Sequence, residues 1–535
     1  MKIRLPMVHL TTGVLEQIAE RRNLGQGDAC QDTSLKWKFL GLAQADLKDR
    51  VNARLAVQGI SRTIARHMPK AVSLPTPIGR QRDVLYLPAR GHFVVLGTAG
   101  SGKTTLAILR AAYLGNPNTG NSGRTLLVTF NRALVTYLRH FHDPSFKNVT
   151  VENYHLFARG YLNSRGRMGY NTICQPPLRA NLIGAAVSHA AGSNTHHAVF
   201  ARGNEFFSGE IQWIEQHGIA SLHEYLQAER IGRDGIPLDK KSRKVAFEVL
   251  EDYLVRRKAA HKEFDWDDMA TAVCTEMDAD GLSRHYKHVV IDEGQDFSPQ
   301  MIRSLSKAIP QEGSLTFFGD MAQQIYGRRM SWKSAGLSVS KIWEFRENYR
   351  NTKQVAALGL AISRMPYFKE TPDLVVPIAP KADGPLPALV ECSSPRTEMA
   401  LVRDQAVEAA KTQTVAVLAR NWDLANEVAK HLPKASVKLD HDLSTWQAGP
   451  KIYYGTFHGA KGLEFDTVIL PFFSQAALPE PEQVRAFGEE EAQVLDGKLI
   501  YVGITRAKTR LIMTFSGSVT ELLPTEPGLY QTSSA

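Results

Sequence analysis

The sequence predicts an α/β protein with two parallel sheets, and three observations lead to that fold class. First, residues 97–105 read GTAGSGKTT, directly after the apolar run 93–96 and before helix-forming sequence at 106–114. Second, short apolar runs alternate with helical segments in the first 320 residues. Third, the same alternation returns over residues 414–514. Strands that alternate with helices form parallel sheets, because each crossover helix returns the chain to the same edge.

The composition is that of a globular chain that can bury several cores. Of its 535 residues 43% are hydrophobic, and this length predicts two to four domains. The four cysteines form no C-x-x-C pair, so neither a zinc ribbon nor an iron–sulfur cluster is indicated, and a reducing compartment fits. There is no apolar run long enough to span a membrane, and the N-terminus makes a poor signal peptide. We therefore expect a cytoplasmic protein with no membrane partner.

The formal net charge of +10 suggests a polyanionic partner. A mildly basic surface that serves solubility is the alternative. Basic residues gather at 240–244, which read KKSRK, and at 256–258, which read RRK, both on helical sequence. Each cluster is either a solvated helix face or a track for phosphates, and the sequence leaves both readings open.

The elements follow in order along the chain. Residues 1–72 have helical periodicity without a readable role, and LPTP at 74–77 reads as a linker. Residues 160–260 read as mostly helical. Expected strands are 125–129, 149–151, 288–291, 315–318, 414–418, 467–470 and 510–514, with helices at 398–411 and 422–432. The tail from Pro524 is rich in Pro, Gly, Ser and Thr, and we expect it to be disordered.

Residues 97–105 match the pattern G-x-x-x-x-G-K-[ST]. An ordinary glycine turn in a loop could match too, but the strand before it and the helix after it favour a phosphate cradle. In that reading Lys103 meets the β- and γ-phosphates of a nucleoside triphosphate, and Thr104 holds Mg²⁺. The predicted nucleotide-binding residues of this loop are Gly97, Gly100, Ser101, Gly102, Lys103, Thr104 and Thr105.

Asp292 and Glu293 end an apolar strand. Mg²⁺ needs a carboxylate beside the Thr104 hydroxyl, which Asp292 can supply, and the attacking water needs a base, which Glu293 can be. Such a pair alone often marks only a turn at the end of a strand. Downstream of a phosphate loop it predicts nucleotide hydrolysis.

From about residue 75 to 515 the chain resembles a superfamily 1 helicase of the UvrD/Rep type, with the motifs in the family's order. Gln81 is similar to the family's adenine-reading glutamine. The string TFNRA resembles the first DNA-contact motif and ENYH the next, which implies Phe130, Asn131, Tyr154 and His155 as nucleic-acid contacts. DEGQD at 292–296 resembles the family's D-E-x-Q-D box.

Later strings extend the resemblance. GDMAQQIY implies that Gln323 senses the γ-phosphate. ENYR implies that Tyr349 stacks on the nucleobase and that Arg350 reaches the γ-phosphate. TFHGAKGLEF and YVGITRAK imply Glu464 at the ribose, Arg506 as an arginine finger, and Thr456 and His458 facing nucleic acid.

Two departures from the family pattern stand out. The aromatic residue expected after Ile325-Tyr326 is missing, and either Trp332 or Arg328 could stack on a base in its place. A core position for Trp332 is an equal alternative. Thr456 comes only 36 residues after Arg420, which leaves no room for the family's 2B insertion.

The resemblance implies two RecA-like P-loop domains, each with a parallel sheet flanked by helices, and a helical 1B insertion. The periodicity of residues 1–72 predicts a mostly helical N-terminal extension before them. The expected boundaries are 1–72 for the extension, 73–162 and 246–335 for domain 1A, 163–245 for 1B, 336–520 for 2A and 521–535 for a disordered tail.

The leading hypothesis for function is an ATP-driven translocase or helicase on single-stranded DNA, moving 3′ to 5′ as the resemblance implies. The alternative is a nucleic-acid-sensing ATPase subunit, for example in anti-phage defence, that regulates a partner nuclease. RNA is a lesser candidate substrate. We expect a protein partner, since the core is short and residues 1–72 are unassigned.

Overall fold

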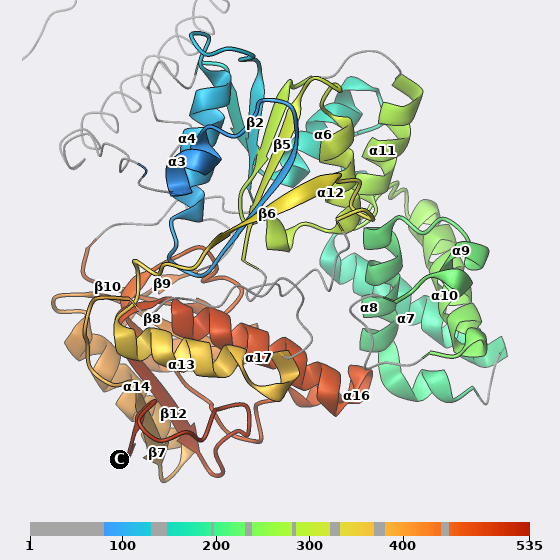
Figure 1. Cartoon of the computed structure of the whole chain (residues 1–535). Coiled ribbons are helices and arrows are strands. Elements are labelled where there is room, and N and C mark those ends of the chain that lie inside the picture. The colour runs from blue at the N-terminus through green and yellow to red at the C-terminus, as the bar shows by residue number, and fades with distance from the viewer. Residues whose placement is uncertain are drawn as a thin grey trace, which may run out of the picture. The chain divides into compact units, whose positions relative to one another are not determined.

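The structure is a computed structural model (Figure 1). It describes residue 77 and residues 80–129, 147–193, 197–230, 238–280, 285–320, 332–368, 380–439 and 449–535. The chain divides into two compact units, Met1–Pro75 and Thr76–Ala535, and the division falls inside the LPTP segment. All described residues belong to the second unit, so the expected N-terminal extension lies outside them.

Among the described residues, six parallel strands form the first sheet, in the order β3-β2-β4-β5-β1-β6. They are β1 (Gly91–Gly97), β2 (Thr125–Val128), β3 (Val149–Glu152), β4 (His288–Ile291), β5 (Ser314–Gly319) and β6 (Val339–Phe345). Strands β2, β4 and β5 are buried along their whole length, as parallel strands covered by helices on both faces must be. Their carboxyl ends meet at one edge, where the loops after β1, β4 and β5 converge.

The helices packed on this sheet are α3 (Arg80–Leu85), α4 (Lys103–Gly115), α6 (Tyr154–Ser164), α11 (Met269–Asp280) and α12 (Pro299–Lys307). Local signals set their ends. Ser298 caps α12 by accepting from the Met301 N–H, and Pro299 occupies its first turn. We call this sheet with its helices the first half.

A helical insertion follows α6, comprising α7 (Pro176–Ser193), α8 (Gly203–His217), α9 (Leu222–Gln227) and α10 (Lys240–Ala259). Its apolar core is separate from that of the first sheet and also contains Ala486 and Phe487 from later in the chain. The expected end of this insertion at residue 245 is wrong, because α10 runs unbroken from its Asp239 cap to Ala259. Its later residues Val249, Leu250 and Tyr253 are buried in the same core. This packing stabilises the helix well beyond residue 245.

The second sheet is also parallel, with the order β13-β7-β12-β11-β8-β10-β9. Its strands are β7 (Ala388–Cys392), β8 (Thr414–Ala419), β9 (Val437–Lys438), β10 (Lys451–Thr456), β11 (Phe465–Leu470), β12 (Ala507–Ser516) and β13 (Gln531–Ser534). Its helices are α13 (Lys353–Ser363), α14 (Pro395–Ala409), α15 (Trp422–His431), α16 (Pro481–Phe487) and α17 (Glu489–Thr505). This sheet with its helices is the second half.

Two further expectations about the chain's parts are wrong. The boundary at residue 336 precedes β6, yet β6 pairs with β1 and completes the first sheet before the chain crosses to the second half. The tail, expected to be disordered, ends in β13, which pairs with β7. Leu522 and Leu523 are buried in the second core, and the Tyr530 hydroxyl donates to the Pro524 carbonyl at 2.8 Å. These contacts hold the tail in an ordered conformation although its composition is polar.

Between β8 and β10 the described residues form only α15 and the short β9. The three cysteines in the described part, Cys174, Cys274 and Cys392, are free and buried. None of the described helices is both long enough and apolar enough to cross a bilayer.

Candidate nucleotide site and nucleic-acid contacts

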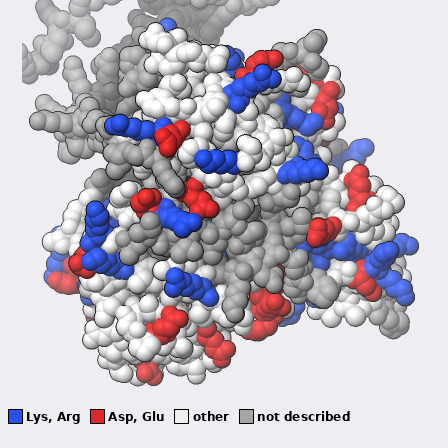
Figure 2. All heavy atoms as spheres, viewed as in Figure 1, with Lys and Arg blue, Asp and Glu red and all other residues white. Residues whose placement is uncertain are grey.

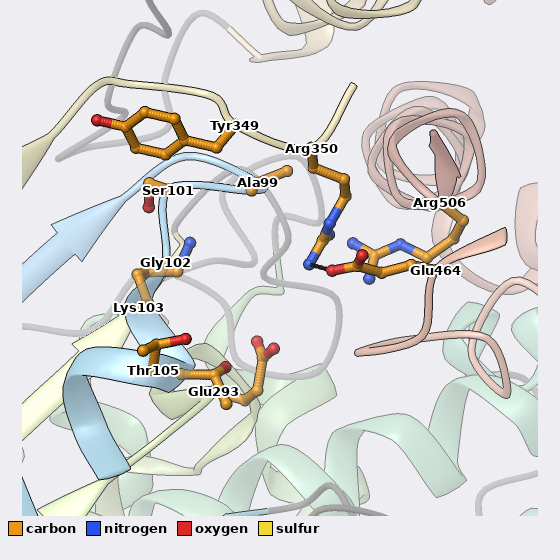
Figure 3. A pocket seen from close by; sticks show the side chains of 12 residues that line it. Ala99, Ser101, Gly102, Lys103, Thr105, Glu293, Tyr349, Arg350, Glu464 and Arg506 are labelled. Carbon is orange, nitrogen blue, oxygen red and sulfur yellow. Dashed lines mark ion pairs between the residues drawn. The ribbon is translucent and has the colours of Figure 1, made fainter. Parts of the chain in front are cut away.

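A cavity of about 270 Å³ lies at the carboxyl edge of the first sheet (Figure 3). It is lined from both halves, by Ala99, Gly100, Ser101, Gly102, Lys103, Thr104, Thr105, Glu293, Tyr349, Arg350, Glu464 and Arg506. The sequence predicts a nucleotide-site role for all of these except Ala99. Segments about 400 residues apart, from Ala99 to Arg506, therefore meet in one place.

The loop after β1 needs its glycines. Gly100 and Gly102 have φ angles of 75° and 83°, in the left-handed region where a residue with a side chain would be strained. A Cβ on Gly100 would also lie 2.6 Å from the Cβ of Arg350. Lys103 is buried and turns back on the loop, its Nζ donating to the Gly97 carbonyl at 2.9 Å and the Thr98 carbonyl at 2.6 Å. Burial lowers its pKa.

Thr104 and Asp292 form a donor set that fits a hard divalent cation. The Thr104 hydroxyl donates to Asp292 Oδ1 at 3.3 Å. Asp292 Oδ2 is buried and has no hydrogen-bond partner among the described residues. Burial, and then the neighbouring Glu293, raise the pKa of Asp292 to about 7. A buried oxygen with an unmet negative charge beside a hydroxyl is what Mg²⁺ would satisfy.

Glu293 points its carboxylate into the cavity from a strained position (Figure 3), with φ at 52°. Gln295 Nε2 donates to the Glu293 carboxylate, and Gln295 Oε1 accepts from the Asp320 N–H at 2.9 Å. Burial alone would raise the pKa of Glu293, but Lys103 and Lys461 outweigh it and hold that pKa below its usual range. The carboxylate is thus ionised and held in place by Gln295, which sequence reasoning did not single out.

The second half brings two guanidinium groups to the cavity (Figure 3). Arg350 pairs with Glu464 at 2.5 Å. Arg506 is buried and donates to the carbonyls of Val502 at 3.1 Å and Leu463 at 3.3 Å. Burial, and then the like charge of Arg350, lower the pKa of Arg506 to about 10. It stays protonated at neutral pH, so positive charge is concentrated where a triphosphate would lie.

The two halves also touch beside the cavity. Lys461 of the second half forms a buried ion pair with Asp296 of the first. Burial raises the pKa of Asp296 to about 6 despite that partner. The Tyr349 N–H donates to the Gly100 carbonyl at 3.1 Å, and the Tyr349 ring is 63% exposed. Sequence reasoning assigned no role to Lys461 and Asp296, although both lie inside motif strings.

Comparisons with known proteins agree with this geometry. Residues 79–342 match the family model described as the UvrD/REP helicase N-terminal domain, and residues 434–518 match the UvrD-like helicase C-terminal domain. The chain belongs to the UvrD/Rep helicase family.

Two similar proteins illustrate the relationship. A protein of Mycoplasma pneumoniae named "Probable DNA helicase" is 23% identical, over 79% of this chain and 80% of its own length. The ATP-dependent DNA helicase UvrD2 of Mycobacterium bovis is 24% identical, over 82% of this chain and 78% of its own. As a member of the family, the chain is an ATP-dependent helicase.

Several predicted residues of this helicase remain to be placed. A Cβ on Gly102 would lie 3.6 Å from the side-chain nitrogen of Gln81, so the amide of Gln81 lies close to the phosphate loop. Phe130, Asn131, Gln323 and Arg328 lie outside the described residues.

Three of the side chains predicted to contact nucleic acid make contacts within the protein, and their contact with nucleic acid stays a prediction. Tyr154 is fully buried, with its hydroxyl 2.8 Å from Ser304 Oγ. Trp332 packs edge-on against Phe317 at 5.1 Å and is partly buried against the first core. The Thr456 hydroxyl is buried and accepts from the Gly459 N–H at 3.1 Å, which shapes the turn after β10.

His155 and His458 are only partly buried. The His155 ring lies edge-on to Trp266 at 4.9 Å, and Trp266 is itself half-buried on the first core. Burial, followed by the charges of Arg420 and Lys461, lowers the pKa of His458 to about 3, so this ring is neutral. Trp266 was missed, although a tryptophan between aspartates is an unusual signal. In Figure 2 the basic side chains are interspersed with acidic ones on the face shown, so charge alone marks no track there.

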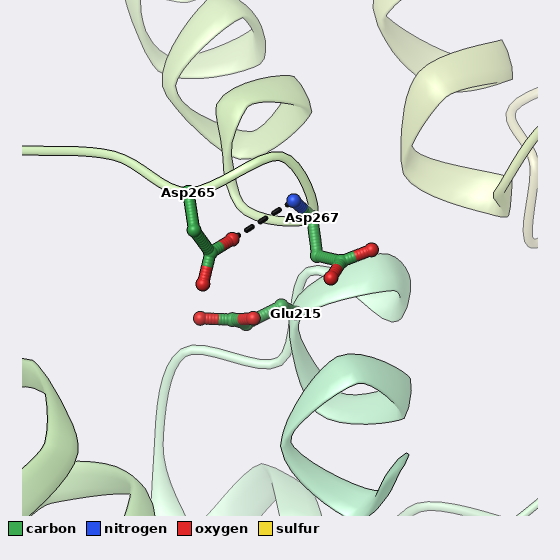
Figure 4. A group of neighbouring side chains, drawn as sticks. All are labelled: Glu215, Asp265 and Asp267. Atoms are coloured by element: carbon green, nitrogen blue, oxygen red, sulfur yellow. Dashed lines mark hydrogen bonds between the residues drawn. The ribbon is translucent and has the colours of Figure 1, made fainter. Parts of the chain in front are cut away.

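Three carboxylates, Glu215, Asp265 and Asp267, have oxygens within 4.8 Å of one another (Figure 4). This is not a metal site, because the Arg179 guanidinium pairs with all three, at 3.3, 3.1 and 3.6 Å. Arg257 adds a second cation, 3.3 Å from Asp265. The cluster is a buried ionic junction that ties α7, α8 and α10 of the helical insertion to the loop before α11.

Proposed function

We propose that this helicase is a translocase on single-stranded DNA that moves 3′ to 5′ and hydrolyses ATP between its two halves. The observation that carries the proposal is the composition of the cavity, where Lys103 and Glu293 of the first half face Arg350 and Arg506 of the second. Since neither half holds a complete set, hydrolysis depends on their spacing, and a spacing that changes with each ATP can drive movement.

Each residue then has a role. Lys103 leaves its loop carbonyls to meet the β- and γ-phosphates, and Glu293, held by Gln295, accepts a proton from the attacking water. Arg350 exchanges Glu464 for the γ-phosphate, and Arg506 stabilises the charge that develops there.

Thr104 and Asp292 would hold Mg²⁺, which neutralises phosphate charge when bound. The remaining nucleotide contacts are Gln81 at the adenine, Tyr349 on its face, Glu464 at the ribose and Gln323 at the γ-phosphate.

For the nucleic acid we propose His155, Trp266 and His458, which are partly exposed residues on the two halves. Aromatic rings stack on bases of any sequence, as translocation requires. DNA is favoured over RNA because the similar proteins are named DNA helicases. The closing string TRAK favours the 3′-to-5′ direction by resemblance.

A nucleic-acid-sensing switch that regulates a partner nuclease is the second candidate. It is favoured by the compact second half, in which only α15 and β9 are described between β8 and β10. Without a further domain there, grip on a duplex would have to come from a partner or from residues 1–72.

The test is ATP hydrolysis by the full chain with no nucleic acid, single-stranded DNA, duplex DNA or RNA, with Glu293→Gln as the inactive control. The translocase predicts strong stimulation by single-stranded DNA, and displacement of streptavidin from a biotin at the 5′ end but not at the 3′ end. Hydrolysis that no nucleic acid changes would refute the motor and favour the switch.

A further inference from the structure

Helix α16 of the second half is docked into the core of the helical insertion (Figure 1). That core is built from α7 to α10 and η2 (Ala198–Arg202), together with Ala486 and Phe487 of α16. The Phe487 ring lies 6.3 Å from the ring of Phe206, and Phe487 is 6% exposed. Beside it, Gln483 Nε2 donates to Glu205 Oε1 at 3.5 Å. Segments nearly 300 residues apart thus pack in one hydrophobic core.

The start of α16 is fixed to the second half. The Glu480 N–H donates to Asp496 at 2.7 Å, and the Glu480 carboxylate pairs with Arg420 at 2.9 Å. That carboxylate also accepts from Asn421 Nδ2 at 2.6 Å. Helix α16 therefore moves with the second half, while its tip lies in the insertion.

A single helix connects this contact to the nucleotide cavity. Only Gly488 separates Phe487 from α17, which runs from Glu489 to Thr505 and is followed at once by Arg506. Its 17 residues span about 25 Å. Most of α17 is buried, so it transmits displacement as a rod rather than by bending.

The helical insertion is held to the first half instead. The ionic junction around Arg179 binds it to the loop that leads into α11. The second half thus meets parts carried by the first half at both ends of α17. If the distance between the two halves changes at the cavity, Phe487 must move within the core of the insertion. Packed apolar cores switch between discrete arrangements and do not deform continuously.

We propose that Phe487 is a latch, which holds Arg506 in the cavity while it is seated and has to move in each cycle of ATP hydrolysis. This inference rests on the proposed function, because it assumes that the halves change spacing. Phe487 is a positioning residue here: it acts on the reaction through α17 and Arg506.

The first experiment closes the latch covalently. Glu205→Cys and Gln483→Cys are combined and joined by oxidation or, where the thiols stay apart, by a short bis-maleimide. We expect hydrolysis in the presence of single-stranded DNA to fall at least about tenfold, and reductant to restore the disulfide form. The two single-cysteine variants are the matched controls. A crosslinked protein that turns over at the parental rate would show a static contact and overturn the proposal.

The second experiment opens the latch. Phe487→Ala is compared with Arg485→Ala, an exposed position on the same helix. We expect Phe487→Ala to lower the ratio of stimulated to basal hydrolysis several-fold at an unchanged circular dichroism spectrum, and Arg485→Ala to keep that ratio. An unchanged ratio in Phe487→Ala overturns the latch.

The two proposals fail separately. If single-stranded DNA does not stimulate the parental chain, the proposed function fails, and the crosslink is then judged on basal hydrolysis. If the parental chain is stimulated but the crosslink has no effect, only the latch fails.

Discussion

The two α/β halves contribute differently to the nucleotide site. In the first half the polar groups are already bonded to one another: Lys103 to its loop, Thr104 to Asp292, and Glu293 through Gln295 to the end of β5. The second half offers an ion pair between Arg350 and Glu464, which nucleotide breaks in the proposed mechanism, and the separately held Arg506. The first half is therefore a preformed cradle, and the second supplies charge that acts only when the halves are close.

The largest effects on kcat should come from removing one candidate catalytic side chain from either half. Glu293→Gln should lower kcat by about 10²–10⁴-fold. Arg506→Ala should lower it by about 10³–10⁵-fold, because it removes charge that counts mainly in the transition state. Both should still bind a fluorescent ATP analogue. Arg510→Ala, on the exposed part of β12, is the control and should keep parental kcat. If Arg506→Ala retained parental kcat, the second half would not take part in catalysis.

A smaller effect should separate nucleic-acid contacts from core residues in the first half. Trp266→Ala should weaken binding of single-stranded DNA by about 1–3 kcal/mol, since a stacked base loses its platform. Fluorescence anisotropy with labelled oligonucleotide measures it. Trp343→Ala, at a half-buried tryptophan of β6, should bind as the parent does. Equal losses in both variants would point to general destabilisation instead of stacking.

Acid should destabilise the first half through His288, which is buried in β4 between Ser314 Oγ at 2.9 Å and the Asn121 carbonyl at 2.8 Å. Burial lowers the pKa of His288 to about 4. Below about pH 6.5 the unfolded chain binds a proton that the folded chain does not, so stability falls as the pH falls toward 4.

Between pH 7 and pH 5 this loss should be roughly 2 kcal/mol for the parent. His288→Gln should be less stable at pH 7 but lose less between the two values, as measured by urea unfolding. A variant with the parental pH dependence would exclude His288 as the source.

The smallest effect should come from Tyr154→Phe. Loss of its hydrogen bond to Ser304 should cost about 1 kcal/mol of stability, and DNA affinity should stay unchanged, because the ring is in the core. Thermal unfolding and anisotropy measure the two. A drop in DNA affinity would return Tyr154 to the nucleic-acid surface.

The grouping of the candidate nucleotide-site residues in one cavity was predictable because its determinants are local. Left-handed glycines at 100 and 102, a lysine that begins a helix and carboxylates at the end of an apolar strand can each be read within a few residues of sequence. Parallel strands then bring their carboxyl ends together whatever the loops between them contain. The two parallel sheets followed from the same kind of pattern.

Only the tertiary structure decided which side chains are exposed. Tyr154 and Thr456 lie in motif strings, yet both are buried and used for packing or a turn, whereas Trp332 and Trp266 stay partly exposed against the first core. The tail pairs as β13, and Phe487 is buried in a core that is built from another part of the chain. The sequence by itself determines backbone conformation and the chemistry available, because both are local. Exposure depends on which distant segment packs against a side chain, and no pattern within a few residues carries that information.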